Sequence, residues 1–572
     1  MAFFHKQGYL FFRPETASPR SIFPFFLASA LLFSTTSVFA DERMPGVVDR
    51  PIIELPTTVS EPKEVEPAKE PELKRPEQPD QPIATISKFS FRGDLVLGEK
   101  ALQKVVTPYI NRTLTVGDIA QLKYELTKHY YDRGYILVKV ATPPQDLADG
   151  EMEIVIYQGR IGSLDVRGDG LNAQVTEAMT SPIVKGEVFN ERKVETALKD
   201  IDDITNIRAR LNLRPGQKPG TTDLRLAFDK VDEERQIFTL DNYGSELTGE
   251  DVGSLHLQKS NLLGFGETFG LDLRKSFNGD NTDLESFEFR FTTPIGWRNL
   301  MLELDYLESD NTIGDRLAAL DAEGESERLT VALSSNIWNQ TKSRAMVRVG
   351  LEVREHESAL AGTQESIDNI TQLFAEATVM RRTPNYVYYS TLQAKKGIGA
   401  FGASDDGDAD ASRANGDPRA WIFNALAYFN FRVTDNDFMQ VYAQGQYTDE
   451  VLLSSDLFSI GGYGSVRGFQ VAQASAEQGG YASIEYRHTF LADGPWGLKA
   501  GPFIDGGWLD SETPNLTIEN EMYSVGIGAE LTYTVSGKYK STLRFDYANP
   551  ISDYDPDLVH EDEYYLRFTQ TF

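Results

Sequence analysis

Few side chains of this 572-residue chain have the spacing that catalysis or metal binding requires. The chain has no cysteine, which excludes disulfides, thiolate metal sites and a cysteine nucleophile, and its six histidines are scattered. Gly397–Gly402 matches Gly-x-Gly-x-x-Gly, but an Asp-rich run follows it instead of the helix that a dinucleotide site needs. Asp406, Asp408 and Asp410 have calcium-loop spacing, yet Ala411 occupies the position of the turn glycine. We therefore expect no enzyme activity, no cofactor and no metal site.

One arginine is distinctive because glycines surround it. The segment Phe458–Phe469 reads Phe-Ser-Ile-Gly-Gly-Tyr-Gly-Ser-Val-Arg-Gly-Phe and holds Arg467 between Val466 and Gly468. Glycine permits tight turns and close backbone approach, so this segment can fold compactly around a guanidinium. Taken alone, the four residues ending at Phe469 fit a solvated loop equally well. The elements around them must decide where the arginine lies.

Apolar and polar residues alternate with period two from about residue 235 onward. In Ser286–Phe291 three phenylalanines share one face, and Met439–Tyr447 alternates in the same way. Such alternation suits a transmembrane β-barrel strand, and also a strand of a soluble sandwich. Acidic Gly/Asn/Asp-rich loops such as 400–417, aromatics near the segment ends and a last strand ending at Phe572 favour the barrel. Residues 233–572 have room for about 16 strands.

The first 81 residues are expected to be a leader followed by a linker. Basic residues precede the apolar stretch Ile22–Phe33, and small residues lead to Ala40, as in a secretory signal peptide over 1–40. An uncleaved anchor helix is the alternative, but Pro24 interrupts its short apolar core. Prolines recur throughout 41–81, which predicts an extended, charged linker rather than a helix.

Two α/β units of similar length are expected between the linker and the barrel. The first, 82–158, has the capping-box pair Thr115 and Asp118 at the start of its second helix. The second, 159–232, has one helix that begins after Asn190. The strands expected in these units are 85–92, 135–140, 151–157, 161–167, 207–213 and 223–228.

The charge balance restricts the partners. The chain has 56 Lys+Arg and 86 Asp+Glu, a formal net charge of −30, so it repels nucleic-acid phosphates. Beyond the N-terminus, no apolar run reaches the roughly 20 residues of a membrane helix. A soluble multidomain protein and a transmembrane β-barrel are the two classes that remain.

The glycine-flanked segment resembles the signature of the TpsB transporters of two-partner secretion, members of the outer-membrane assembly-factor superfamily. In that family, the Val-Arg-Gly-Phe/Tyr tetrad lies at the tip of a long extracellular loop that folds back into the barrel. A second family motif, Phe-x-Asp-x-Gly on the inner wall, matches Phe503, Asp505 and Gly507. The resemblance implies a loop-to-barrel-wall lock between Arg467 and Asp505, in which a partly desolvated guanidinium gains a bidentate acceptor.

The resemblance covers nearly all of the mature chain. Tyr131–Ile136 and Asp149–Ile154 resemble the first POTRA domain of these transporters, and Leu240–Ser245 resembles their first barrel strand. The terminal Phe572 resembles the outer-membrane assembly signal. Many members carry an N-terminal plug helix, but the prolines of 41–80 argue against one here, so we expect the folded-in loop alone to close the pore.

The resemblance implies an antiparallel transmembrane β-barrel preceded by two POTRA domains, placed in the outer membrane with the POTRA domains in the periplasm. Its function would be to bind an unfolded exoprotein through the POTRA domains and secrete it. That partner would be an adhesin, haemolysin or toxin with an N-terminal secretion domain. The lipid bilayer and the barrel-assembly machinery would be further partners.

The alternatives are a general outer-membrane insertase of the same superfamily, a passive porin and a soluble secreted β-enzyme. Two POTRA units rather than a longer array favour secretion over the insertase. A porin has no periplasmic domain, so residues 82–230 speak against it.

Overall fold

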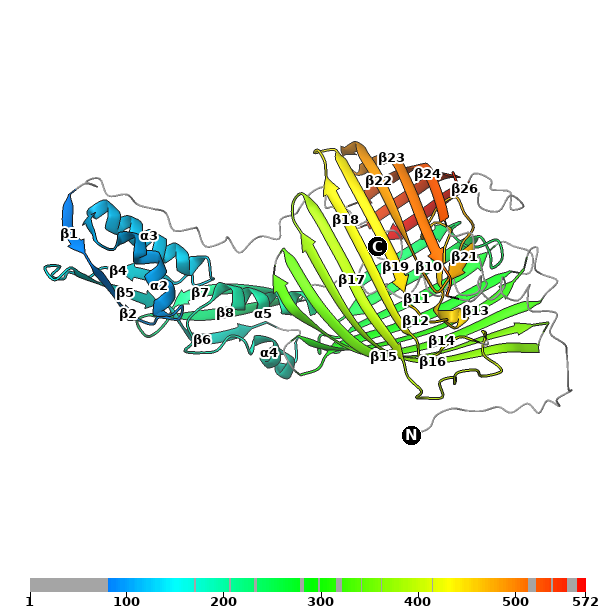
Figure 1. Ribbon diagram of the computed structural model, residues 1–572, viewed down its shortest axis with the longest axis horizontal. Coiled ribbons are helices and arrows are strands. Elements are labelled where there is room, and N and C mark those ends of the chain that lie inside the picture. Colours follow the sequence, from blue (N-terminus) through cyan, green and yellow to red (C-terminus); the bar gives the residue numbers. More distant parts are fainter. Residues whose placement is uncertain are drawn as a thin grey trace.

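The structure is a computed structural model that describes residues 81–572, except 169–170, 205–206, 231–233, 278–281, 297–298, 315–320, 341, 362, 414, 513–520, 536–538 and 553–562. The predicted signal peptide, the linker apart from Gln81, and the predicted absence of a plug helix therefore lie outside the described residues. Figure 1 shows two small α/β domains that extend from one end of a large barrel.

The first α/β domain contains five strands, two α-helices and one short 3-10 helix. These are β1 (Pro82–Ile86), β2 (Lys88–Gly93), α2 (Glu99–Val106), η1 (Thr107–Tyr109), β3 (Arg112–Thr115), α3 (Val116–Tyr131), β4 (Val138–Ala141) and β5 (Glu151–Gln158). The sheet order is β2-β5-β4, with β2 parallel to β5, and β1 pairs with β3. The capping box is confirmed, because Thr115 accepts from the Asp118 N–H and Asp118 accepts from the Thr115 N–H.

One expected strand of this domain is divided in two. The expected strand over 85–92 breaks at Ser87, because the N–H groups of Ser87 and Lys88 both donate to the Gly150 carbonyl. The break lets Ile86 and Phe89, three positions apart, enter the same core. Strand β3, which pairs with the first half, was not expected.

The second α/β domain repeats the sheet plan of the first. Its elements are β6 (Arg160–Arg167), α4 (Ala173–Thr180), α5 (Glu191–Ile204), β7 (Ile207–Pro215) and β8 (Thr221–Lys230). The order β6-β8-β7 again joins a parallel and an antiparallel pair. Helix α4 was not expected, because only Val175 and Met179 among its apolar residues mark an inward face. Asn190 caps α5 as expected, since its side chain accepts from the Lys193 N–H at 3.3 Å.

The rest of the chain forms a closed antiparallel barrel of 16 strands, so the predicted fold class is confirmed. In chain order the strands are β9 (Glu234–Asp241), β10 (Asp251–Ser260), β11 (Thr268–Phe277), β12 (Asp283–Pro294), β13 (Leu300–Ile313), β14 (Ala322–Gln340), β15 (Ser343–Leu360), β16 (Thr363–Arg382), β17 (Tyr386–Gly397), β18 (Trp421–Arg432), β19 (Asp437–Tyr447), β22 (Gln478–Asp493), β23 (Trp496–Asp510), β24 (Glu521–Val535), β25 (Tyr539–Pro550) and β26 (Glu563–Thr571). Strand β26 pairs with β9 and closes the barrel.

The strands turn apolar side chains outward and polar side chains inward. On β14, Leu329, Val331 and Leu333 are exposed on the outer face, whereas Arg328 and Ser334 are buried toward the lumen. This arrangement explains the period-two pattern of the sequence, since successive side chains of a strand point to opposite faces. Among the residues that the structure describes, no helix is long and apolar enough to cross a membrane.

The second α/β domain contacts the barrel end where β9 begins. The Asn172 N–H donates to the Gly264 carbonyl at 2.9 Å, and Asn339 Nδ2 donates to Asp200 Oδ1 at 2.8 Å. Met301 packs against the core of α4 and α5. The turns after β10 and β14 therefore lie at the domain end, and the connections after β17 and β19 lie at the opposite end.

Candidate functional site

A long connection between β19 and β22, residues 448–477, folds into the barrel lumen. We name it the inserted loop. It contains η3 (Ser454–Asp456) and the paired strands β20 (Phe458–Ile460) and β21 (Ala474–Ala476). Its apolar side chains pack against Leu509 of β23 and Met522 of β24. The inserted loop is thus held to the inner wall by a small apolar core.

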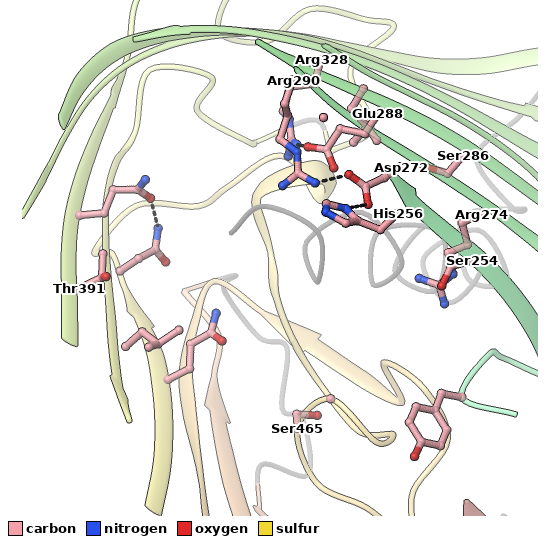
Figure 2. Close-up of a pocket in the computed structure, with 18 of the residues that line it drawn as sticks. Ser254, His256, Asp272, Arg274, Ser286, Glu288, Arg290, Arg328, Thr391 and Ser465 are labelled. Carbon is pink, nitrogen blue, oxygen red and sulfur yellow. Dashed lines mark hydrogen bonds and ion pairs between the residues drawn. The ribbon is translucent and has the colours of Figure 1, made fainter. Parts of the chain in front are cut away.

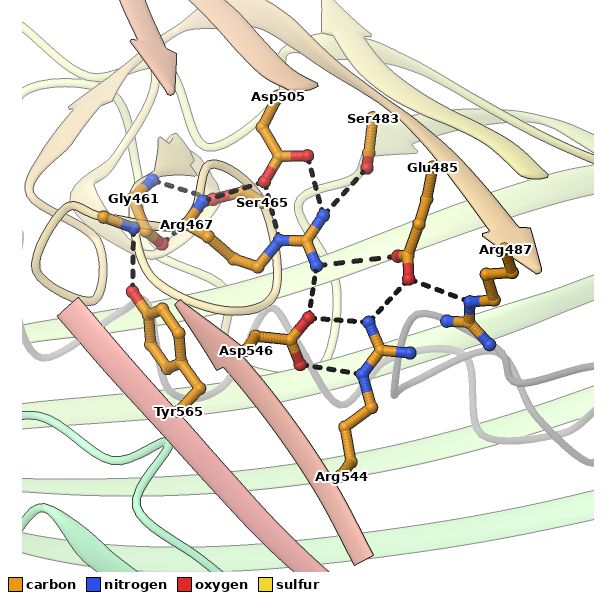
Figure 3. Close-up of polar contacts among 11 residues, drawn as sticks. Gly461, Ser465, Arg467, Ser483, Glu485, Arg487, Asp505, Arg544, Asp546 and Tyr565 are labelled. Atoms are coloured by element: carbon orange, nitrogen blue, oxygen red, sulfur yellow. Dashed lines mark hydrogen bonds and ion pairs between the residues drawn. The ribbon is translucent and has the colours of Figure 1, made fainter. Parts of the chain in front are cut away.

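Glycines with left-handed backbone shape the tip of the inserted loop. Gly461, Gly462 and Gly468 have φ values of 116°, 82° and 89°, which residues with a Cβ rarely adopt. The Gly461 N–H donates to Ser465 Oγ at 2.7 Å, and the Gly462 N–H donates to the Phe469 carbonyl at 3.0 Å. These bonds close a tight turn that directs the Arg467 side chain toward the wall (Figure 3).

The Arg467 guanidinium forms a bidentate ion pair with Asp505 of β23. Nε lies 2.8 Å from Asp505 Oδ2 and Nη2 lies 3.0 Å from Oδ1, while the Arg467 backbone N–H donates to Oδ2 at 3.2 Å. Both residues are 0% exposed. A charge buried to this degree needs close partners, and the two-point geometry supplies them.

Two further carboxylates complete the surroundings of Arg467. Nη1 lies 2.9 Å from Asp546 Oδ1 on β25 and 3.5 Å from Glu485 Oε2 on β22. Arg544 bridges these two acids at 2.6 Å from each, and Arg487 pairs with Glu485 at 2.8 Å (Figure 3). The inserted arginine therefore enters a network of alternating charges contributed by the wall strands β22, β23 and β25.

Aromatic side chains enclose the network. The Cζ atom of Arg467 lies 3.1 Å from the centroid of the Phe503 ring, so guanidinium and ring are stacked. The Tyr565 hydroxyl of β26 accepts from the Gly468 N–H at 2.9 Å. Tyr463 of the inserted loop stacks on Tyr243 at 3.7 Å and meets Tyr565 edge-on at 5.5 Å. The tip thus also contacts the seam between the last and first strands.

The remaining motif residues make room for the tip. Val466 and Phe469 are buried in the apolar core of the inserted loop. A Cβ at Gly507 would lie 3.1 Å from Val466 Cγ2 and 3.2 Å from Ile460 Cδ1. The glycine therefore lets the inserted loop approach the wall closely.

The sequence alone did not single out Glu485, Arg487, Arg544, Asp546 or Tyr565. A signal was present, because Arg544 and Asp546 flank the outward-facing Phe545, and Glu485 and Arg487 flank Tyr486. Charged residues spaced by two within a barrel strand mark its lumen face. Which of the many lumen charges meet the arginine depends on strand register, which sequence spacing does not give.

The lumen beside the inserted loop retains a cavity of about 1150 Å³. His256, Asp272 and Arg290 line it, with His256 Nδ1 2.6 Å from Asp272 Oδ1 and Arg290 paired to the same carboxylate (Figure 2). No group of His, Asp and Glu among the described residues has the geometry of a metal site. Charged, polar and apolar side chains thus line the cavity beside the inserted loop.

The terminal strand places Tyr564, Leu566 and Phe568 on the outer face. The Phe572 N–H donates to the Gln236 carbonyl at 3.0 Å, and its ring is exposed at the domain end of the barrel.

Comparisons with known proteins agree with this architecture. The family model "Haemolysin secretion/activation protein ShlB/FhaC/HecB" matches residues 220–532, and the model "POTRA domain, ShlB-type" matches residues 84–159. The chain is 25% identical over 407 residues to the outer membrane transporter CdiB of Dickeya dadantii, covering 70% of this chain and 71% of that protein. It is 20% identical over 492 residues to the heme/hemopexin transporter protein HuxB of Haemophilus influenzae, covering 82% and 84%.

Solved structures show the same fold. The structure of CdiB from Escherichia coli superposes with a TM-score of 0.74 at 21% identity, covering 88% of this chain and 94% of that one. CdiB from Acinetobacter baumannii gives a TM-score of 0.68 at 16% identity, covering 86% and 90%. Because the first family model spans more than half of the sequence, the chain belongs to the haemolysin secretion/activation family ShlB/FhaC/HecB and is an outer-membrane transporter of two-partner secretion.

Proposed function

We propose that this transporter binds one unfolded exoprotein in the periplasm and passes it through the barrel to the cell surface, with the Arg467 lock holding the pore closed between transport events. One observation carries the proposal: a guanidinium from the extracellular inserted loop is buried against the inner wall of a barrel that has α/β domains at its other end. The inserted loop occupies the route that the exoprotein would take.

The two α/β domains offer edges to which an extended chain can add. In the described part of the chain, β4 and β7 each lie at one edge of their sheet and each follow the second helix of the domain. Backbone bonds to an edge strand bind an extended chain of any sequence, and side-chain pockets add selectivity. We propose that both domains act as POTRA domains and that these edges hold the exoprotein.

Opening requires that Arg467 exchange its partners. Three carboxylates and a stacked ring surround a fully buried guanidinium, and breaking such a pair by removing one partner costs about 3–5 kcal/mol. We propose that the entering exoprotein supplies the compensating contacts and that its folding outside the cell drives export. No nucleotide enters this scheme.

The other parts of the chain have proposed roles as well. Residues 1–40 would direct export and be removed, residues 41–81 would be a linker, and Phe572 would present the last strand to the barrel-assembly machinery. The lipid bilayer would cover the apolar outer band. The partner would be an adhesin, haemolysin or toxin with an N-terminal secretion domain; the relative named hemolysin transporter protein HpmB, of Proteus mirabilis, supports this class.

Deletion of the transporter tests the proposal against the insertase alternative. We expect one large exoprotein to disappear from the cell surface and medium, while the abundance of other barrel proteins in the outer membrane stays the same. A general fall in barrel proteins would instead support the insertase.

Crosslinking tests the proposed binding edges of the two α/β domains. Photo-crosslinkers at Lys139 of β4 and Arg210 of β7 should capture the exoprotein, whereas one at Glu177 of α4 should not.

A further inference from the structure

A second extracellular connection lies across the two ends of the inserted loop. It comprises the described residues of 398–420, between β17 and β18, that is, all except 414, and we name it the strap. The Asp417 N–H of the strap donates to the Val451 carbonyl at 2.7 Å, and a Cβ at Gly416 would lie 2.8 Å from Leu453 Cδ2. The strap therefore packs directly against the segment by which the chain enters the lumen.

Arg413 of the strap binds both ends of the inserted loop at once. Nη1 donates to the Leu452 carbonyl at 2.6 Å, near the start of the inserted loop, and Nη2 lies 2.6 Å from Oε1 of Glu477, the last residue of that loop. Arg413 is 6% exposed and Glu477 is 0% exposed. A rigid guanidinium fork is suited to joining two acceptors at fixed separation, which a lysine cannot do.

The groups on either side of Arg413 are themselves fixed. Glu477 Oε2 accepts from Ser511 Oγ at 2.9 Å and from the Glu512 N–H at 3.2 Å, so the whole carboxylate is bonded. Ser412 donates through Oγ and N–H to Asp368 of β16, at 2.6 and 2.9 Å, and its Oγ accepts from the Ser454 N–H at 3.0 Å. The strap is thus bonded to the barrel wall beside the first residues of the inserted loop.

We propose that Arg413 holds the two ends of the inserted loop together through its contacts with Leu452 and Glu477, and we name these contacts the clasp. The pore would then be closed by two sets of contacts, those of Arg467 at the tip of the loop and the clasp at its ends. This inference rests on the proposed closing role of the inserted loop. The contacts of Arg467 lie inside the barrel, on β22, β23 and β25, whereas the clasp comes from the strap, which is a different extracellular connection. Withdrawal of the loop then requires the strap to move, which places a control point at the outer end of the barrel.

The cysteine-free chain allows a direct test. Ala476 is 2% exposed in the closed state, so Ala476→Cys reports loop movement by its reaction with a membrane-impermeant maleimide added to intact cells. In this background, Arg413→Ala should raise the labelling rate about tenfold. Arg413→Lys should raise it less, because one of the two contacts can re-form. Arg419→Ala is the matched control, since Arg419 belongs to the same strap but pairs with the exposed Asp405, and its labelling should equal that of the parent.

Single-channel conductance of the purified full-length protein in planar bilayers gives the second measurement. Arg413→Ala should increase the frequency of large openings, and combination with Arg467→Ala should increase it beyond either single change. Labelling and openings at the parent level in a folded Arg413→Ala protein would overturn the clasp. If that variant does not accumulate, Glu477→Ala, which removes the acceptor of Arg413 Nη2, replaces it, and unchanged labelling overturns the clasp in the same way. If Arg467→Ala changes neither labelling nor openings, the proposed closing role of the inserted loop is wrong. If Arg467→Ala changes them and Arg413→Ala does not, the closing role stands and only the clasp is wrong.

Discussion

Arg467 lies flat on Phe503, with its Cζ atom 3.1 Å from the ring centroid, while its edge meets Asp505 two residues further along the same strand. One strand thus provides both an aromatic ring that stacks on the face of the guanidinium and a carboxylate that binds its edge. Electrostatic attraction to a ring face adds about 2 kcal/mol when the cation is desolvated. The Phe-x-Asp spacing has a direct physical basis, because residues two apart on a strand point to the same face.

Replacement of the arginine by lysine tests this geometry. Arg467→Lys keeps the charge but loses the fork to Asp505 and the planar stack on Phe503. We expect reduced exoprotein secretion and more frequent channel openings, with a larger effect for Arg467→Ala. The measurements are immunoblots of the culture medium and planar-bilayer recordings. Normal secretion by Arg467→Ala at normal barrel levels would contradict the assigned role.

A double-mutant cycle separates direct contact from independent effects. Open probability gives a free energy for the closed-to-open equilibrium, and Arg467→Ala with Asp505→Asn should show a coupling of about 0.5–3 kcal/mol. Arg467→Ala with Asp437→Asn is the control, since Asp437 lies at the domain end of β19 and binds Tyr486 and His488. Additivity at the first pair would count against contact in the membrane-embedded protein.

Gly507 tests the close approach of the inserted loop to the wall. Gly507→Val places branched carbons where Val466 and Ile460 already lie at 3.1 and 3.2 Å from a Cβ position, so the tip cannot seat fully. We expect a leaky pore and faster proteolysis of the inserted loop in isolated membranes. Ile504→Val, on the outer face of the same strand, should leave both measurements unchanged.

The capping box of α3 predicts a pH dependence of stability in the first POTRA domain. The Thr115 N–H, with smaller contributions from the Thr115 hydroxyl and Arg112, lowers the pKa of Asp118. A carboxyl whose pKa is lower in the folded state stabilises that state above its unfolded pKa, about 4, and loses this contribution as the pH falls through the folded pKa. Asp118→Asn should therefore lower the POTRA unfolding temperature at pH 7, and this difference should shrink below about pH 4. A difference that is constant with pH would contradict the assignment; Asp146→Asn, in an exposed turn, is the control.

Much of the architecture could be predicted because the relevant patterns are local. Alternation within segments such as Ser286–Phe291 reflects one lipid face and one lumen face, and the structure contains the expected 16 strands. The short elements β3 and α4 escaped prediction because each has too few apolar positions to define a period. Tertiary pairing determines them instead, β3 with β1 and α4 against α5.

The site was only partly predictable. Arg467 and Asp505 were identified through a family resemblance, and the structure brings them together. Asp546 and Glu485 join them because the registers of β22, β23 and β25 bring distant lumen positions to one height. Arg413 lies in a loop between Asp-rich and Pro-containing stretches, where no periodic pattern exists, and its role depends wholly on how two extracellular connections meet.

The chain order of the lock residues has a consequence for biogenesis. Asp505 and Asp546 follow Arg467 by 38 and 79 residues, and Tyr565, which bonds the Gly468 N–H, follows later still. A nascent barrel that lacks its last strands therefore has no complete seat for the arginine. With the proposed closing role of Arg467, the pore is sealed only after the last strands are in place, so control of permeability depends on completion of the polypeptide.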